Sequence, residues 1–486
     1  MDKRKLSGGI MAAVMCLMTA CGSTGAPAPA DTTAAETVAQ TETDAETATS
    51  EETTAPEEQE TEETTVTTEK KKKKKIEEDI PSLCEVFGGD FKVGTALTPA
   101  DMISKNTMAL AKKHFNDSMT IGNEMKPDYV LDKGACITMF KDTGNDEDPQ
   151  VNFNQAKPLL DYCSENGIPM RVHTLVWHSQ TPTWFFKEGY DDEGEWVSPE
   201  KMNIRMENYI RNYFAVLTEQ YPDIEFYACD VVNEAWMEDG KPRKPGSREE
   251  GEGLSPWVKV YGDNSFIEYA FTYARKYAPE GCKLYYNDYN EYMNGKLAAI
   301  YEMAEDFKEK GIIDGIGMQS HLDVRHGSDA FPSVSMYDHA LDMYSNLGLD
   351  IQVTELDAGV PADSGDKYFE AQAEYYHGIW KAIYAHRENV SAVILWGVTD
   401  DRSWRRDGQP LMFNKDFLAK PNFYSIIGIP DEPEDGPAEE TEGAAEGETS
   451  DTDTAETDES AAEENTEEAA AEETTEETAE ETEKAE

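Results

Sequence analysis

The segment 170–234 holds the pattern that decides the fold: MRVHTLVW at 170–177, PEKMNIRMENYIRNYFAVLTEQ at 199–220 and EFYACDVVNE at 225–234. Two short apolar runs with the length of buried strands flank a longer segment with helical spacing. The start of this helix is well marked, because Ser198 can cap it, Pro199 suits its first position and Glu200 favours its positive end. The segment therefore predicts one strand–helix–strand unit.

The same alternation extends along the chain in both directions. Short apolar runs expected to form strands lie at 91–97, 119–125, 170–177, 225–234, 283–290, 314–321, 350–357 and 390–400. Segments with the length and spacing of helices lie at 101–115, 154–166, 199–220, 265–278, 296–310, 335–347 and 367–386. Eight strands that alternate with helices predict a parallel sheet closed into a (β/α)8 TIM barrel. An open doubly wound sheet is the alternative, disfavoured because no glycine-rich phosphate-binding loop follows the first strand.

The net charge of −56 over 486 residues is concentrated in two segments of low complexity. Residues 31–69 hold 13 acidic residues and no basic one, and residues 431–486 hold 26 acidic residues and a single lysine. Both segments lack the residues of a core, so we expect a disordered linker over 22–79, a catalytic domain over 80–430 and a disordered tail over 431–486. Nothing here could neutralise a row of phosphates, which argues against nucleic acid as a partner.

The first 21 residues have the features of a secretion signal. A basic stretch at 2–5 precedes an apolar run at 10–18 that is too short to span a bilayer, and MTACG follows at 18–22. This ending resembles a bacterial lipoprotein box, in which Cys21 would carry a lipid that anchors the protein to the outer face of the cell membrane. The alternative is ordinary cleavage and secretion, with an incidental cysteine. The lysine run at 70–75 is interpreted as a solvated part of the linker rather than as a contact with an anionic surface.

The remaining cysteines do not suggest a disulfide framework or a zinc site. They are odd in number, widely scattered and contain no CxxC pair. These residues are Cys84, Cys136, Cys163, Cys229 and Cys282. Cys229 lies in an apolar strand and is expected to be a small core residue.

Polar and aromatic residues gather where the predicted strands end. In a (β/α)8 barrel the carboxyl ends of the strands meet on one face and form the active site. From the second strand to the eighth these ends supply Asn123-Glu124-Met125-Lys126, His173 with Trp177-His178, Asn233-Glu234, Asn287-Asp288-Tyr289-Asn290, Gln319-Ser320-His321, Glu355-Leu356-Asp357, and Trp396 with Trp404. Indole rings offer flat faces to sugar rings, while amides and carboxylates bind hydroxyl groups in defined directions. The mixture indicates a carbohydrate site.

Glu234 and Glu355 are the best candidates for catalysis, because each closes a strongly apolar strand. Two carboxyl groups can cleave a glycosidic bond when one protonates the leaving oxygen and the other attacks the anomeric carbon. A metal site is the competing use of such residues. However, His173 and His321 come with Asn and Gln rather than with a third strong ligand, so neither a metal ion nor a cofactor is expected.

A series of motifs resembles, in order, those of glycoside hydrolase family 10, the endo-β-1,4-xylanases. The two signature strands are DVVNEA at 230–235 and VTELD at 353–357. The other matching motifs are GNEMK at 122–126, HTLVWHSQ at 173–180, SPW at 255–257, GMQSH at 317–321, WGVTD at 396–400 and PLMF at 410–413. The resemblance covers essentially all of 80–430. One departure is Gly122, where many family members have Glu, and it puts one contact at sugar subsite −2 in doubt.

The resemblance implies a role for each matching residue. Glu234 would be the acid/base and Glu355 the nucleophile. Asn233 would hold the 2-hydroxyl of the sugar at subsite −1. His321 would bond the nucleophile, and Asp357 would orient His321. The implied sugar-binding side chains are Asn123 and Lys126 at subsite −2, His173, Trp177 and Gln319 around subsite −1, and Trp396 and Trp404 over the glycone side.

The sequence thus predicts a retaining endo-β-1,4-xylanase that acts on xylan and xylo-oligosaccharides. Two glutamates at close range are not both ionised cheaply, so Glu355, beside His321, should be the carboxylate and Glu234 the acid. A retaining β-1,4-glucanase is one alternative. A non-catalytic protein that only binds plant-wall glycans is another, but such a protein should have lost one carboxylate. The acidic segments are expected to be accessory spacers, and nothing supports an obligate oligomer, so a monomer is expected.

Overall fold

The computed structural model describes residues 75–325, 331–362 and 366–433. Cys21, the segment 22–74 and the acidic residues 434–486 lie outside these ranges, so what the sequence predicts for them stays a prediction. Within the described ranges, no helix is both long and apolar enough to cross a membrane.

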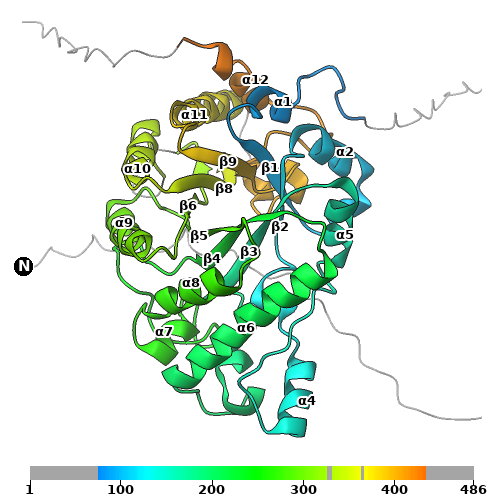
Figure 1. The fold of residues 1–486 in the computed structure, drawn as a ribbon. Helices are drawn as coiled ribbons and strands as arrows, with labels where there is room; N and C mark the ends of the chain where they lie inside the picture. The colour runs from blue at the N-terminus through cyan, green and yellow to red at the C-terminus, as the bar shows by residue number, and fades with distance from the viewer. Residues whose placement is uncertain (1–74, 326–330, 363–365, 434–486) are drawn as a thin grey trace, which may run out of the picture. The chain divides into compact units, whose positions relative to one another are not determined.

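The described residues form a closed barrel of eight parallel strands, which confirms the predicted (β/α)8 fold (Figure 1). The sheet runs β6-β5-β4-β3-β2-β1-β9-β8, and pairing of β6 with β8 closes it. The short strand β7 adds a separate ladder on β8 at the outer end. The strand bounds are β1 Lys92–Leu97, β2 Ser118–Ile121, β3 Met170–Trp177, β4 Phe226–Asn233, β5 Lys283–Asp288, β6 Gly315–Met318, β7 His321–Asp323, β8 Asp350–Gly359 and β9 Val390–Leu395.

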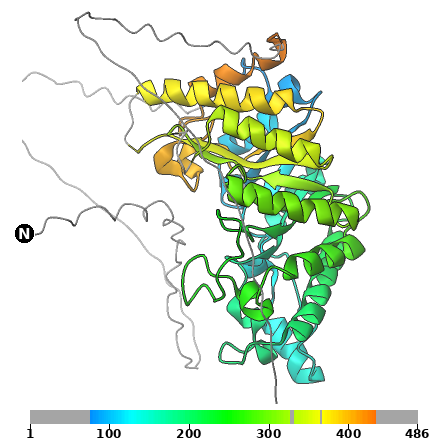
Figure 2. The same ribbon diagram turned by 90° about the vertical axis from the view of Figure 1, so that its left-hand side faces the viewer.

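Helices surround this barrel, and seven of them match the predicted segments. Figure 2 shows three of these, the green-to-yellow helices α9, α10 and α11, side by side along one flank. The matching helices are α2 Lys105–His114, α5 Lys157–Asn166, α6 Pro199–Gln220, α8 Phe266–Tyr277, α9 Asn294–Glu309, α10 Val334–Asn346 and α11 Asp366–Ala385. The sequence did not predict α1 Leu83–Phe87, α3 Pro127–Val130, α4 Lys133–Thr143, α7 Pro256–Tyr261 and α12 Pro421–Ile426. Most of these are too short to show a helical period.

Helix α6 illustrates how local sequence and packing agree. The Ser198 side chain accepts a hydrogen bond from the backbone N–H of Lys201 at 3.3 Å, as expected of an N-cap. The buried side chains of α6 recur every three or four residues, so one stripe of the helix faces the barrel: Met202, Arg205, Met206, Tyr209, Ile210, Tyr213, Phe214 and Leu217. The helix is therefore positioned mainly by burial of this stripe.

The interior of the barrel contains a buried ion pair. The guanidinium of Arg171 on β3 donates to both carboxylate oxygens of Asp230 on β4, at 2.6 and 3.0 Å. It also donates to Gln352 on β8 at 2.7 Å, and all three side chains are buried. Breaking such a pair would leave an unpaired buried charge, which is costly. The three side chains therefore hold β3, β4 and β8 together across the barrel.

Three predicted strands end at least three residues earlier than the sequence pattern indicates. The strand predicted over 119–125 ends at Ile121, and the one predicted over 390–400 ends at Leu395. The strand predicted over 314–321 breaks after Met318, because Ser320 adopts a left-handed backbone conformation with φ 59°. In each case the residues after the break leave the strand and lie at the carboxyl end of the barrel.

Contacts of the folded domain reach slightly beyond 80–430. The backbone carbonyls of Glu77 and Glu78 accept hydrogen bonds from Lys113 at 3.0 and 2.8 Å. At the other end, the carboxylate of Glu432 pairs with His377 and Lys381 on α11, at 3.5 and 3.4 Å. The five cysteines of the domain are free, and Cys229 is fully buried in β4, as expected of a core residue.

Candidate active site

Glu234 directly follows the last residue of β4, and Glu355 lies within β8. Both side chains are buried. Glu234 has φ 57°, in the left-handed region that side chains rarely occupy. Its backbone N–H donates to the carbonyl of Asn287 at 2.9 Å, and Arg243 donates to its carbonyl oxygen at 2.5 Å. The surroundings therefore hold the glutamate in a backbone conformation that it would not adopt alone.

The carboxyl group of Glu234 is surrounded by hydrogen-bond donors. The indole N–H of Trp177 donates to Oε2 at 2.9 Å. The amides of Gln319 and Asn233 donate to Oε1 at 3.0 and 3.2 Å. The guanidinium of Arg243 lies 4.0 Å from Oε2. These contacts fix the direction in which the carboxyl group faces.

Asn287, at the end of β5, connects the two glutamates. Its Nδ2 lies 2.9 Å from Oε1 of Glu355 and 2.9 Å from Oδ1 of Asn233, the residue next to Glu234. Its own Oδ1 accepts a hydrogen bond from Thr354 at 2.6 Å. A side chain at Gly317 would overlap Oδ1 of Asn287, so the glycine leaves the space that the bridging amide needs. One amide thus positions both carboxyl groups.

His321 links Glu355 to a second carboxylate. Its Nε2 lies 3.2 Å from Oε2 of Glu355, and its Nδ1 lies 3.0 Å from Oδ1 of Asp357. Burial alone would lower the pKa of His321, but the carboxylates of Asp357 and Glu355 outweigh it and raise that pKa to about 10. The imidazole is therefore held as a cation at neutral pH. Trp404 and Arg405 donate to the two oxygens of Asp357 at 3.0 and 2.6 Å.

Glu355 is set up as a carboxylate. Burial would raise its pKa, but the nearby His173, His321 and Lys126 outweigh that effect, and the pKa lies below its ordinary value. Nδ1 of His173 lies 3.9 Å from Oε1 of Glu355. An ionised, buried oxygen nucleophile is what the sequence predicts at this position.

His173 is in turn held by Asp230. Its Nδ1 lies 3.0 Å from Oδ2 of Asp230, the carboxylate that also binds Arg171. Burial would raise the pKa of Asp230, but Arg171 and His173 lower it below its ordinary value. The buried ion pair of the barrel interior therefore extends up to the catalytic end.

The predicted sugar-binding residues surround the two glutamates. Nζ of Lys126 lies 4.8 Å from the ring centre of Trp177 and 6.0 Å from that of Trp396, and it donates to Asn123 at 3.2 Å. Burial lowers the pKa of Lys126 to about 8, although Glu355 and Glu234 favour its charged form.

The three tryptophans of the site differ in solvent exposure. Trp177 is buried, whereas 47% of Trp404 is exposed. The ring of Trp396 lies 5.3 Å from His173, and that of Trp404 lies 5.0 Å from His321. The structure thus brings together the twelve predicted site residues that it describes, and Cys21 lies outside the described chain.

Several residues that shape the site have no role that the sequence indicates. Asn287 stands at a predicted strand end and Asp230 inside a signature motif, but neither pattern predicts what the residue does. Arg171, Arg243 and Arg405 belong to none of the motifs. Asn287 could have been found by its position at the end of an apolar run. No spacing signal marks the arginines, because their partners lie far away or across loops.

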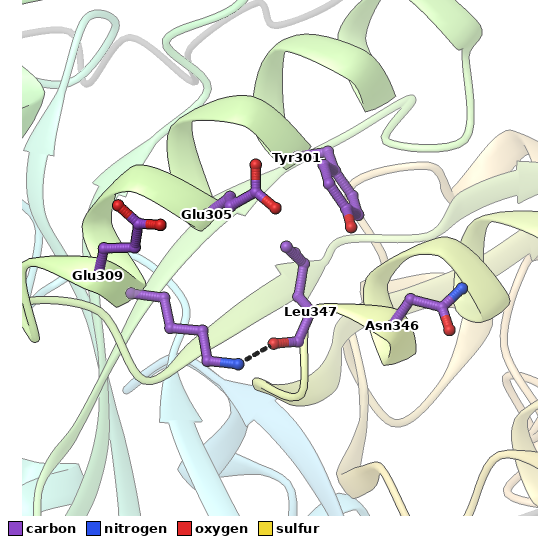
Figure 3. Close-up of a pocket in the computed structure, with 6 residues that line it drawn as sticks. Tyr301, Glu305, Glu309, Asn346 and Leu347 are labelled. Atoms are coloured by element: carbon purple, nitrogen blue, oxygen red, sulfur yellow. Dashed lines mark hydrogen bonds between the residues drawn. The ribbon is translucent and has the colours of Figure 1, made fainter.

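A surface hollow between α9 and α10 is separate from these groups (Figure 3). It is lined by Tyr301, Glu305, Lys308, Glu309, Asn346 and Leu347. Lys308 donates to the backbone carbonyl of Leu347 across it. The hollow lies where the chain enters β6 and β8, at the end of the barrel opposite the glutamates. Among the described residues, no group of three or more His, Cys, Asp or Glu side chains is arranged to hold a metal ion.

The family model described as glycosyl hydrolase family 10 matches residues 82–429. The chain belongs to this family. Its barrel, with one glutamate after β4 and another within β8, is the family 10 domain, and the two acidic segments lie outside the matched residues.

Two curated relatives are 41% identical to this chain. One is endo-1,4-beta-xylanase Y of Acetivibrio thermocellus, matched over 71% of this chain and 32% of the relative. The other is the bifunctional endo-1,4-beta-xylanase XylA of Ruminococcus flavefaciens, matched over 72% of this chain and 34% of the relative. The chain thus spans about a third of the length of these relatives.

Solved xylanase structures share the fold. The CBM22-1–GH10 modules of Clostridium thermocellum Xyn10B, complexed with xylohexaose, match with 40% identity and a TM-score of 0.66, over 72% of this chain and 67% of that one. The intracellular xylanase TsXylA of Thermoanaerobacterium saccharolyticum matches with 31% identity and a TM-score of 0.62, over 72% of this chain and 99% of that one.

Proposed function

We propose that this protein is an endo-β-1,4-xylanase that cleaves internal bonds of xylan with retention of the anomeric configuration. The observation that carries the proposal is the hydrogen-bonded frame that joins the two glutamates. The hydrogen bonds run from Asn233 to Glu234 at 3.2 Å, from Asn287 to Asn233 at 2.9 Å and from Asn287 to Glu355 at 2.9 Å. Two carboxyl groups fixed relative to one another are the requirement for double displacement.

In the first step, the carboxylate of Glu355 attacks the anomeric carbon of the sugar at subsite −1. Glu234 gives its proton to the glycosidic oxygen, the bond to the leaving sugar breaks, and a covalent ester with Glu355 forms. His321, Lys126 and His173 favour the ionised nucleophile before the attack. The negative charge of Asp357 offsets the positive charge of His321. Little net positive charge therefore opposes the oxocarbenium ion that develops at the anomeric carbon.

In the second step, Glu234 acts as the base. Formation of the ester has removed the negative charge of Glu355, so the carboxylate of Glu234 can accept a proton from water. The water oxygen bonds to the anomeric carbon, the ester bond breaks, and Glu355 leaves as a carboxylate. Two inversions give net retention, and Glu234 regains its proton.

The choice of xylan over other β-1,4 glycans rests on family membership and on the relatives. The two curated relatives are named endo-1,4-beta-xylanases, and one matched structure holds xylohexaose. Trp404 is half exposed beside His321, so its indole ring is accessible to a sugar of a longer chain.

Proton NMR of xylohexaose hydrolysis tests the proposal. We expect internal cleavage and initial appearance of the β-anomer, which mutarotates later. Cellohexaose, assayed in parallel, should be cleaved far more slowly. An α-anomer as first product would contradict the retaining mechanism, and preferred cleavage of cellohexaose would favour a β-1,4-glucanase instead.

We also propose that the protein is a lipoprotein attached at the outer face of the cell membrane through Cys21. The support is the sequence alone: a basic start, a short apolar run and a cysteine after small residues. In this arrangement, residues 22–74 and 434–486 act as charged spacers between the anchor, the barrel and the surroundings.

A further inference from the structure

A single turn after β6 contacts both glutamates. Gln319 donates to Glu234 at 3.0 Å, and Nε2 of His321 lies 3.2 Å from Glu355. Ser320 stands between them with φ 59°, a conformation that costs free energy for any residue except glycine. The position of this turn therefore decides whether two of the groups around the catalytic pair reach their partners.

The side chain of Ser320 does not face the sugar site but is anchored beneath it. Its Oγ lies 2.7 Å from the hydroxyl of Tyr337 on α10 and 3.1 Å from Oε1 of Glu291, which follows β5. All three side chains are fully buried. The hydroxyl thus connects the strained turn to two neighbouring elements, and a glycine at this position would lose both contacts.

Glu291 is an unusual residue for this place. It is a fully buried carboxyl group, and its Oε2 has no hydrogen-bond partner among the described residues. A buried carboxylate with an unpaired oxygen is costly, so the neutral acid is favoured. Burial accordingly raises the pKa of Glu291 to about 7. The groups that face it are Asp288 and Lys296, which pair with each other, and the tyrosines Tyr292, Tyr337, Tyr344 and Tyr375.

We propose that Glu291 is a positioning residue that acts through Ser320 to hold the turn carrying Gln319 and His321 to the catalytic glutamates. The inference rests on the proposed function, because its readout is turnover of xylan. Glu291 contributes to catalysis by geometry rather than by contact with substrate. Since the turn reaches both Glu234 and Glu355, its displacement should slow chemistry more than it weakens binding.

Two substitutions at Glu291 separate geometry from charge. Glu291→Gln keeps the shape and the hydrogen bond to Ser320, whereas Glu291→Leu keeps bulk but loses the hydrogen bond. We expect the Leu variant to lower kcat roughly tenfold to a hundredfold with KM changed by less than about threefold. The Gln variant should retain kcat within about threefold of the parent protein at pH 6.

The chain offers a matched control for the hydroxyl contact. Tyr337→Phe removes the 2.7 Å contact to Ser320 beneath the turn. Tyr227→Phe removes an equivalent 2.7 Å contact between Tyr227 and Ser118, also buried but at the opposite end of the barrel. Both should lower the melting temperature by similar amounts, and only Tyr337→Phe should lower kcat.

The outcomes distinguish this inference from the proposed function. If the unmodified protein does not cleave xylan, the proposed function is wrong, whatever Glu291 does. If it does and the Leu variant folds with unchanged kcat, the inference is wrong. Ser320→Ala removes the contact through which Glu291 would act, so an unchanged kcat in this variant would also overturn the inference and decides the question should the Leu variant not fold. The comparison of Tyr337→Phe with Tyr227→Phe shows whether the second anchor of Ser320 contributes.

Discussion

Glu355 and Asp357 lie two residues apart on β8 and contact the two nitrogens of one imidazole, that of His321. Side chains at this spacing face the same side of a strand, so one strand supplies both carboxylates. The distances are 3.2 Å from Glu355 to Nε2 and 3.0 Å from Asp357 to Nδ1. Asp357 therefore keeps the ring charged, and the charged ring keeps the nucleophile ionised.

Asp357→Asn should shift the acid limb of activity to higher pH. Without this carboxylate the pKa of His321 falls, Glu355 loses the neighbouring cation, and the pKa of Glu355 rises. The ionised nucleophile is then lost at a higher pH as the solution is acidified, so kcat/KM measured from pH 4 to 8 should drop first at the acid end. Asp350→Asn, the same change at the start of β8, should leave the profile in place. An unmoved acid limb in Asp357→Asn would show that Asp357 does not keep Glu355 ionised through His321.

Glu355→Ala should abolish turnover of xylan. The covalent intermediate cannot form without this carboxylate, and we expect a loss of at least roughly 10⁴-fold in kcat. Glu305→Ala, which removes an exposed glutamate from the hollow between α9 and α10, should have full activity. Release of reducing sugar from soluble xylan measures both. Ordinary activity in Glu355→Ala would show that the nucleophile lies elsewhere.

Glu234→Ala should lose activity selectively according to the leaving group. Substrates with excellent leaving groups need no protonation, so aryl xylobiosides of acidic phenols should be cleaved to the ester stage at nearly normal rates. Xylan and aryl xylobiosides of weakly acidic phenols should be cleaved very slowly. Pre-steady-state release of the phenol over a series of leaving groups gives the dependence. Equal losses across the series would argue against the acid role.

Much of this site follows from the sequence because it lies on strands. The alternation of apolar runs predicts the barrel, the barrel places strand ends on one face, and the spacing of Glu355 and Asp357 places both on one side. The positions of Arg405 and Glu291 do not follow in this way. Arg405 reaches Asp357 from a loop after β9, and Glu291 reaches Ser320 from the turn after β5. Such contacts depend on how loops pack, for which the local sequence carries no periodic signal.

The ends of strands β2 and β9 differ from the sequence prediction for a related reason. Apolar residues recur at Met125 and Val398, beyond the last residues of β2 and β9, so the predicted strands are too long. Both residues are buried, but Met125 lies in a turn and Val398 in a bend. Burial alone does not distinguish a strand from a packed turn, and the strand ends are therefore the least predictable part of the barrel.

Glu291 should make folding stability depend on pH. An unfolded chain releases the proton of this group near pH 4.5, whereas the folded protein keeps it until about pH 7. The folded state binds more protons than the unfolded state in this window. The contribution of Glu291 to folding stability is therefore fully present below pH 4.5 and is lost as the pH rises to about 7. The loss is on the order of 3 kcal/mol. Urea unfolding of the parent protein and of Glu291→Gln at pH 5 and pH 8 measures it, and the Gln variant should gain in relative stability at pH 8. A constant difference between the two proteins would contradict the buried acid.

Cys21→Ala should release the protein from the membrane without changing its chemistry. The lipid would attach to the Cys21 sulfur, so the variant has no anchor, while the barrel from Glu77 to Glu432 is untouched. Cys16→Ala alters a second cysteine only five residues earlier, inside the apolar part of the signal, and serves as the matched control. Xylanase activity in the membrane and soluble fractions of expressing cells, with and without detergent, measures the effect. We expect the parent and Cys16→Ala in the membrane fraction and Cys21→Ala in the soluble one, with equal kcat. Identical partitioning of all three would show that Cys21 is an incidental cysteine beside an ordinary cleavage site.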